Sequence, residues 1–262
     1  MDGDAVVAAC QIPVEDLDVD ANLARIEERL AAVEADVALF PELALTGFVA
    51  DDRIERAAVR TDGAALDRVR DLAGAHDTSL VVGYAEAGGD AYHNTVAYVA
   101  TDGAVTTYRK RHLWGGEADV FEPGTEYVVV DSPAGPAGLV TCYDLNFVTD
   151  SAAFLDRGVD ALYVVGAWPA THAQNWRLLV RARALDGVRW AVACGRTGRR
   201  DLPDAEPTTY AGRSLVARPD GVVAGELAHA PDDLVVTLDN AVFQRQRELV
   251  GVQVGNGDAN RQ

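Results

Sequence analysis

Short hydrophobic runs alternate with amphipathic segments in the first third of the chain. The runs are apolar almost throughout, which is typical of strands buried on both faces, and they lie at 5–12, 36–40 and 79–84. Apolar positions recur at helical spacing in 20–33, where Asp20 is the expected N-cap, and in 63–76. Strands that alternate with helices in this way predict an α/β fold.

Later strands follow one another more closely. The segments 94–99 and 105–108 flank Thr101-Asp102-Gly103, a turn signal that predicts a hairpin. Further strands are expected at 127–130, 138–142, 161–165, 190–194, 214–217, 222–225 and 234–237. Helices are expected at 149–158, at 176–187 with Leu178, Leu179 and Leu185 inward, and from Asn240. These elements predict a mixed sheet, or two stacked sheets, covered by helices.

No break in composition divides the 262 residues, so we expect a single domain over 1–254. The polar residues 255–262 are expected to form a disordered tail. Two segments, 109–126 and 196–210, have no clear period and are predicted to be loops, the second of them exposed. Loops held by a rigid scaffold are where function concentrates.

The charge balance excludes some partners. The formal net charge is -18, which would repel phosphate backbones and anionic membranes over the whole surface, so neither nucleic acid nor membrane is an expected partner. Every basic residue is arginine except Lys110, a composition that favours either adaptation to high salt or a GC-rich genome. An ammonium retained at one position suggests a task for a compact, titratable charge.

The cysteines are Cys10, Cys142 and Cys194, an odd number without paired spacing, which favours a reducing compartment. The acidic N-terminus lacks the features of a signal peptide, and no apolar run approaches the roughly 20 residues of a membrane span. We therefore expect a cytoplasmic protein.

Cys142 ends an apolar run just before a predicted helix. A thiol there lies near free N–H groups that favour a thiolate and can hold an oxyanion. The alternative is that Cys142 is a small core residue. The sequence supports both interpretations about equally.

Two more polar residues follow predicted strands in the same way. Glu42 comes just after one strand and Lys110 just after another, and sites in α/β sheets form beyond the carboxyl ends of strands. A carboxylate base, an ammonium and a thiol suffice for acyl transfer without a histidine. Taken singly, Glu42 could instead cap the turn at Thr46-Gly47, and Lys110 could be one charge of a solvated run.

Three segments together resemble the signature of the nitrilase, or carbon–nitrogen hydrolase, superfamily. They are Phe40-Pro41-Glu42-Leu43-Ala44-Leu45-Thr46-Gly47-Phe48, Tyr108-Arg109-Lys110-Arg111-His112-Leu113 and Gly138-Leu139-Val140-Thr141-Cys142-Tyr143-Asp144. Further segments follow in the family's order, including His93-Asn94-Thr95, Phe121-Glu122-Pro123-Gly124 and Trp168-Pro169. The resemblance covers nearly the whole domain.

This resemblance implies an αββα four-layer sandwich of the nitrilase type, which commonly pairs through its helices into a homodimer or larger homo-oligomer. It implies Cys142 as nucleophile, Glu42 as general base and Lys110 as oxyanion stabiliser. The backbone N–H of Tyr143 would be a second oxyanion donor, and Glu117 would position the substrate or the triad. The expected reaction hydrolyses a small amide through a thioester, with no metal and no cofactor.

Other positions depart from the family's common pattern. Asn146 stands where many members have arginine, which puts the substrate in doubt because residues after the nucleophile often line the acyl pocket. The Trp168-Pro169 segment is similar to that of the ω-amidase-like branch, which acts on dicarboxylate monoamides, although Trp168 could equally be a core aromatic. A distal carboxylate would need a cation, and the candidates are Arg111, His172 and Arg196.

Three alternatives remain open. The same triad could serve a nitrilase or an N-carbamoyl amide hydrolase. A papain-like pairing would use His112 or His172 as the base. A binding or scaffold protein could have kept the fold and lost turnover.

Overall fold

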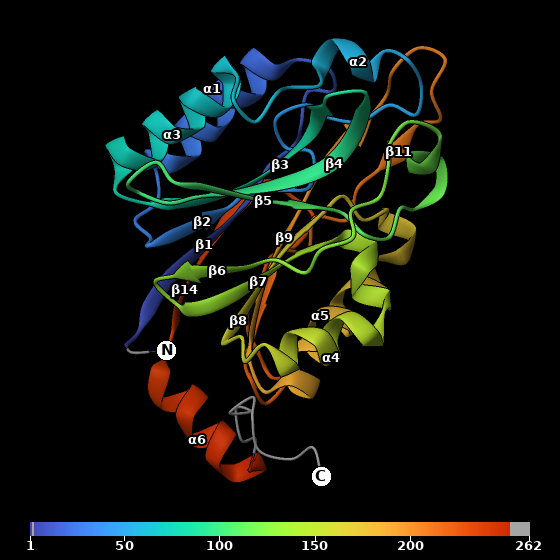
Figure 1. The fold of residues 1–262 in the computed structure, drawn as a ribbon. Coiled ribbons are helices and arrows are strands. Elements are labelled where there is room, and N and C mark those ends of the chain that lie inside the picture. The colour runs from blue at the N-terminus through green and yellow to red at the C-terminus, as the bar shows by residue number, and fades with distance from the viewer. Residues whose placement is uncertain (2, 252–262) are drawn as a thin grey trace.

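The computed structural model, which describes residue 1 and residues 3–251, contains two six-stranded sheets stacked face to face (Figure 1). The strands of the first sheet are, in spatial order, β14 (Asp232–Leu238), β1 (Ala5–Gln11), β2 (Val37–Leu39), β3 (Ser79–Gly88), β4 (Ala91–Val99) and β5 (Val105–Arg109). Those of the second are β13 (Val223–Glu226), β12 (Leu215–Ala217), β9 (Trp190–Gly195), β8 (Ala161–Gly166), β7 (Gly135–Thr141) and β6 (Val129–Ser132).

Helices cover the outer face of each sheet, which gives the four αββα layers that the family resemblance implies (Figure 1). The α-helices are α1 (Val19–Leu30), α2 (Ile54–Ala57), α3 (Ala64–His76), α4 (Val148–Asp156), α5 (Ala173–Gly187) and α6 (Asn240–Val250). Minor elements are the 3-10 helices η1 (Gly115–Asp119), η2 (Cys142–Asn146) and η3 (Ala170–His172), and the short strands β10 (Arg199–Arg200) and β11 (Thr208–Thr209). No helix among these is both long and apolar enough to cross a membrane.

Three hydrophobic layers hold the sandwich together. Side chains such as Leu39 and Tyr163 meet between the two sheets, α1 and α3 pack on the first sheet, and α4 and α5 pack on the second. Strands β1 to β3 run parallel, as do β7 to β9, and each is buried on both faces. This double burial explains why their sequences are almost uninterrupted apolar runs.

The strand β5 is antiparallel to β4, which is antiparallel to β3, so the carboxyl end of β5 lies at the same end of the first sheet as those of β2 and β3. In the second sheet, β7 and β8 end side by side. Hydrogen bonds between the two sheets show that these strand ends meet, and the polar residues that follow them form one cluster.

Two local expectations about the helices are wrong. The N-cap of α1 is Asp18, whose side chain accepts a hydrogen bond from Ala21 N, while Asp20 lies inside the first turn. Leu178 and Leu185 of α5 are 64% and 53% exposed. The buried face of that helix instead follows Trp176, Val180 and Ala184, and Leu178 is rotated about 200° from Trp176.

The segment 196–210 is not simply an exposed loop, because Arg196 and Tyr210 are buried in it. The strand expected at 127–130 begins two residues later, and β3 and β4 extend further to form a long hairpin. The expected tail at 255–262 lies outside the described residues.

Candidate active site

Cys142 lies at a sharp turn where β7 ends. Its φ of 48° is in the left-handed region that non-glycine residues rarely occupy. The side chain is nearly buried, but it lines two cavities. Cys10 and Cys194 are fully buried in the core, so Cys142 is the thiol that a small molecule can reach.

Glu42 is carried by a tight turn after β2, where Pro41 ends the strand. The turn packs against β3 at Gly83, where an added Cβ would lie 2.5 Å from Leu43 N, so only glycine permits this approach. The carboxylate is buried and accepts hydrogen bonds at both oxygens. Asn94 Nδ2 donates to Oε1 at 2.8 Å and the backbone N of Ala167 donates to Oε2 at 2.7 Å. Glu42 therefore does not cap the turn at Thr46-Gly47.

Lys110 follows β5 directly and is 2% exposed, so it is not part of a solvated basic run. Its Nζ donates to Glu42 Oε1 at 2.7 Å and to the two oxygens of Glu117 at 2.9 and 2.7 Å. These bonds join three segments that are distant in the sequence. The only lysine of the chain is thus held as a compact charge between two carboxylates.

Glu117 of η1 and Asn94 of β4 complete this cluster. The same Asn94 Nδ2 that bonds Glu42 also donates to Glu117 Oε1 at 2.7 Å, and Trp114 N donates to Glu117 Oε2 at 2.7 Å. Both oxygens of Glu117 are engaged within the cluster. The sequence alone predicts no role for Asn94, although its place in the His93-Asn94-Thr95 segment is a signal.

The acid–base character of the cluster follows from its burial and charges. Burial favours the protonated form of Glu42, but Lys110 and Asn94 outweigh it and hold the pKa of Glu42 below its usual value. Burial, followed by the charge of Glu42, raises the pKa of Cys142 well above that of a free thiol. Burial alone would lower the pKa of Lys110. The charges of Glu42 and Glu117 outweigh burial and raise this pKa well above its usual value. The resting cluster therefore holds a carboxylate base, an ammonium and a protonated thiol.

A cavity of about 750 Å³ opens above this cluster. Glu42, Lys110, Glu117 and Cys142 line it, and its walls include the aromatic side chains of Phe48, Trp114 and Tyr210. This volume suits a small organic molecule, since ligand cavities commonly span roughly 300–1,000 Å³. A small substrate can thus reach the sulfur and both charged partners together.

A second cavity of about 160 Å³ also contains Cys142. The predicted pocket residues Asn146, Trp168 and His172 all line it, and Trp168 Nε1 donates to the backbone O of His172 at 2.9 Å. Trp168 also packs in the hydrophobic layer under α5, so it is a core aromatic that also forms part of the cavity wall. Because this cavity touches Cys142 but neither Glu42 nor Lys110, it adds room for a substituent beside the sulfur.

Two candidate cations for a distal carboxylate lie elsewhere. Arg111 pairs with Asp150 at 2.7 Å, and Arg196 is buried in an ion pair with Asp16 at 2.6 Å. Neither arginine lines the two cavities, whereas His172 lines both.

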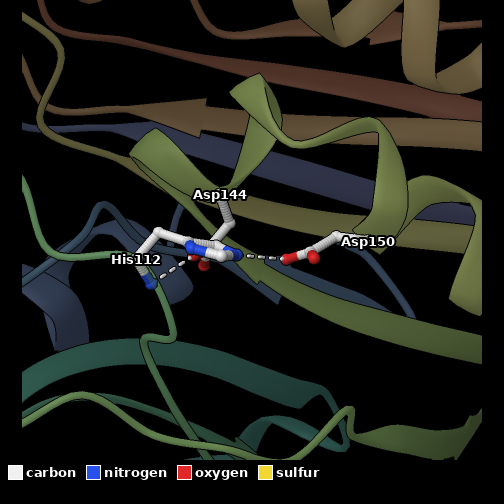
Figure 2. Close-up of side chains that lie close together, drawn as sticks. All are labelled: His112, Asp144 and Asp150. Atoms are coloured by element: carbon white, nitrogen blue, oxygen red, sulfur yellow. Dashed lines mark hydrogen bonds and ion pairs between the residues drawn. The ribbon is translucent and has the colours of Figure 1, made fainter.

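The second candidate histidine, His112, does not face the thiol. Its Nε2 lies 3.1 Å from Asp150 Oδ2 and its ring stacks on Phe147, with the ring centroids 3.5 Å apart. His112, Asp144 and Asp150 come close enough to suggest a metal site (Figure 2). However, both carboxylates already accept hydrogen bonds at each oxygen, and Arg111 supplies a cation, so this donor set does not fit a metal ion.

Known proteins resemble the chain over most of its length. It is 29% identical to an (R)-stereoselective amidase of a Pseudomonas species, over 87% of this chain and 83% of that protein. It is 32% identical to the ω-amidase YafV of Yersinia enterocolitica, over 73% of this chain and 74% of that enzyme.

Solved structures agree in fold. A carbon–nitrogen hydrolase superfamily protein of Xanthomonas campestris superposes with a TM-score of 0.87 at 23% identity, covering 99% of both chains. An amidase of Nesterenkonia sp. superposes with a TM-score of 0.82 at 25% identity, covering 96% of both chains. The family model for carbon–nitrogen hydrolases matches residues 6–247, and the chain therefore belongs to this family of the nitrilase superfamily and is a carbon–nitrogen hydrolase with amidase relatives.

Proposed function

We propose that this enzyme uses Cys142 to hydrolyse a small aliphatic amide to a carboxylic acid and ammonia. The observation that carries the proposal is the ammonium of Lys110, hydrogen-bonded to Glu42 and Glu117, on the floor of a cavity that also contains the thiol. Burying charged groups costs desolvation free energy, and clusters of buried charged groups that line a cavity are typical of functional sites. It supplies a base, an oxyanion partner and a nucleophile in one place.

In the first half of the reaction, Glu42 accepts the proton of the Cys142 thiol as the sulfur attacks the amide carbon. The carbonyl oxygen becomes an oxyanion, to which Lys110 Nζ and the backbone N–H of Tyr143 donate. Glu42 then gives its proton to the amide nitrogen, the C–N bond breaks and ammonia leaves. A thioester between the acyl group and Cys142 remains.

In the second half, Glu42 takes a proton from water and the resulting hydroxide attacks the thioester carbon. The tetrahedral intermediate uses the same oxyanion donors. It then expels the Cys142 sulfur, which recovers its proton from Glu42, and the carboxylic acid is released. Glu42 thus acts alternately as base and acid, which suits a carboxylate that is ionised at rest.

The relatives support an amide substrate. Related structures show the Nesterenkonia amidase with butyramide bound, and with acrylamide added to its active-site cysteine. Butyramide is therefore a reasonable first substrate for this chain. A nitrilase or N-carbamoyl hydrolase activity uses the same residues and stays the alternative.

A dicarboxylate monoamide fits the site less well. Arg111 and Arg196 are occupied in ion pairs. Arg200 lines the large cavity, but its hydrogen bonds go to the cavity wall, including Phe48 O and Thr208 Oγ1. Acidic residues line the same cavity: Asp51, Asp204 and Glu206. We propose that neutral amides are preferred over anionic ones.

We also propose a homodimer that pairs through α4 and α5. Val148 of α4 and Leu178 and Leu185 of α5 are each more than half exposed on the outer helical layer. A second copy of the chain would cover these side chains.

The test is ammonia release from butyramide and other small amides by the native protein and by Cys142→Ala. We expect turnover by the native protein and none by the variant, and mass spectrometry of the native protein should detect an acyl adduct on Cys142. A native protein that binds amides without releasing ammonia would favour the scaffold alternative. Equal ammonia release from both proteins would remove Cys142 from the mechanism.

A further inference from the structure

The carboxylate of Asp144, two residues after the nucleophile, is buried and bonded to three donors from three places in the chain. Its Oδ2 accepts from Tyr108 Oη at 2.7 Å and from Thr141 N at 3.1 Å, and its Oδ1 accepts from His112 N at 3.0 Å. The residue is 2% exposed. Neither Asp144 nor any of these donors lines the two cavities, so Asp144 is not placed to contact a substrate bound there.

The three donors flank the two reacting residues. Tyr108 is two residues before Lys110 and His112 is two residues after it, while Thr141 immediately precedes Cys142. Tyr108 belongs to β5 of the first sheet and Thr141 to β7 of the second. One carboxylate therefore ties the segment that carries the lysine to the turn that carries the nucleophile.

The nucleophile turn needs such a tie. A non-glycine residue in the left-handed region costs on the order of 1–3 kcal/mol and persists only when its surroundings hold it. Cys142 has this conformation, and the bond from Thr141 N to Asp144 closes the turn around it. Phe147 N also donates to the backbone O of Asp144, at 3.0 Å.

A second carboxylate holds the same segment from the side of α4. Asp150 accepts from Arg111 Nη1 at 2.7 Å and lies 3.1 Å from His112 Nε2. Figure 2 shows His112 joined to both carboxylates, to Asp144 through its backbone N and to Asp150 through its imidazole. The two residues after Lys110 are thus fixed on both sides.

From these contacts we propose that Asp144 is a positioning residue, which sets the placement of Lys110 relative to the sulfur of Cys142. The inference rests on the proposed function, because it assigns a task in the cysteine mechanism. Removing the carboxylate should therefore slow the chemical step more than it weakens substrate binding. A misplacement of about 1 Å can cost roughly 100-fold in rate.

The test compares three variants by their kcat and KM on butyramide and by their melting temperature. Asp144→Asn keeps the side chain's volume but replaces an acceptor by a donor, and kcat should fall about 100-fold with KM nearly unchanged. Tyr108→Phe keeps the carboxylate and removes one charge-assisted bond, so kcat should fall about tenfold. This second variant keeps the proposal falsifiable if Asp144→Asn does not fold.

Tyr163→Phe is the matched control. Tyr163 is also a fully buried tyrosine between the sheets, and its hydroxyl lies 2.8 Å from Ser132 Oγ, away from the site. It should lower the melting temperature about as much as Tyr108→Phe does while leaving kcat within about twofold of the native value. The proposal is wrong if Tyr108→Phe retains native kcat, or if the control loses kcat to the same extent.

A readout without substrate separates this proposal from the proposed function. Iodoacetamide labelling of Cys142, located by mass spectrometry and followed against pH, reports how Lys110 stabilises the thiolate. In Tyr108→Phe the pH at which the labelling rate of Cys142 is half its maximum should be higher than in the native protein. In Tyr163→Phe this pH should be unchanged. If the native protein hydrolyses no amide, the proposed function fails, while this labelling comparison still decides the role of Asp144.

Discussion

The thiol of Cys142 is not activated in the resting enzyme. The sequence suggested a thiolate stabilised by a helix N-terminus, but the element that begins there is a single 3-10 turn, η2. Burial and the adjacent charge of Glu42 raise the pKa of the thiol. In the proposed mechanism, proton transfer to Glu42 must therefore accompany attack, which makes the orientation of Glu42 as important as that of the sulfur.

Ionisation of Asp144 should reduce the stability of the folded chain. Burial raises the pKa of its carboxyl from 3.8 to about 6, although Tyr108, Lys110 and the backbone of Thr141 and His112 favour the ionised form. The folded chain thus binds this proton more tightly than the unfolded chain does. Folding takes up a proton between these two pH values, and the contribution of Asp144 to stability falls as pH rises through this window.

We therefore predict a pH-dependent difference between the native protein and Asp144→Asn. Asparagine does not titrate, so the free energy of unfolding of the variant minus that of the native protein should increase by about 2 kcal/mol from pH 4 to pH 7. Denaturant unfolding of both proteins at several pH values measures it. A difference that does not change with pH would show that Asp144 titrates normally in the folded chain.

Sequence reasoning identified the residues whose chemistry is distinctive and missed those that hold them. Glu42 and Lys110 follow strands and carry unusual chemistry, so they were predicted to lie with Cys142, and the structure brings all three together. Asn94 and Asp144 act through hydrogen bonds between distant segments. No local pattern encodes such bonds, because each depends on how the two sheets stack.

Elements were predicted best where burial is complete. The parallel strands β1, β2 and β8 are apolar throughout and were located to within about a residue at most of their ends. The amphipathic elements were harder, since a leucine on a helix predicts burial without saying what covers it. In α5 the buried face is set by Trp176, Val180 and Ala184, Leu179 is partly buried beside it, and Leu178 and Leu185 face outward.

The exposed leucines of α5 lead to a prediction about assembly. If a second copy covers α5, then Leu178→Glu places a charge in an apolar interface and should convert the dimer to a monomer. Light scattering after size-exclusion chromatography measures the mass. Leu249→Glu, in the similarly exposed last turn of α6, is the matched control and should leave the mass unchanged. A native protein that is already monomeric would contradict the proposed pairing.

The charge of the whole molecule acts on the substrate as well as on solubility. The net charge of -18 makes the surroundings of the site negative, and Asp204 and Glu206 are exposed where they line the large cavity. The arginines near the site are held by carboxylates or by the cavity wall. We therefore expect an anionic substrate to be repelled at long range and by the acidic residues of the cavity.

We accordingly predict that kcat/KM discriminates by substrate charge. At low salt, 5-methylhexanamide should be hydrolysed about tenfold more efficiently than glutaramate, which has a carboxylate in place of the branched end, and added salt should narrow the gap by screening. Glu206→Gln should also reduce the difference in kcat/KM between the two substrates. Melting temperatures measured at each salt concentration control for changes in stability. Glutaramate hydrolysed as well as the neutral amide would contradict the prediction. The residue to test would then be His172, because among the three candidate cations it alone lines both cavities. If His172 holds the distal carboxylate, its replacement by asparagine should raise KM for glutaramate alone.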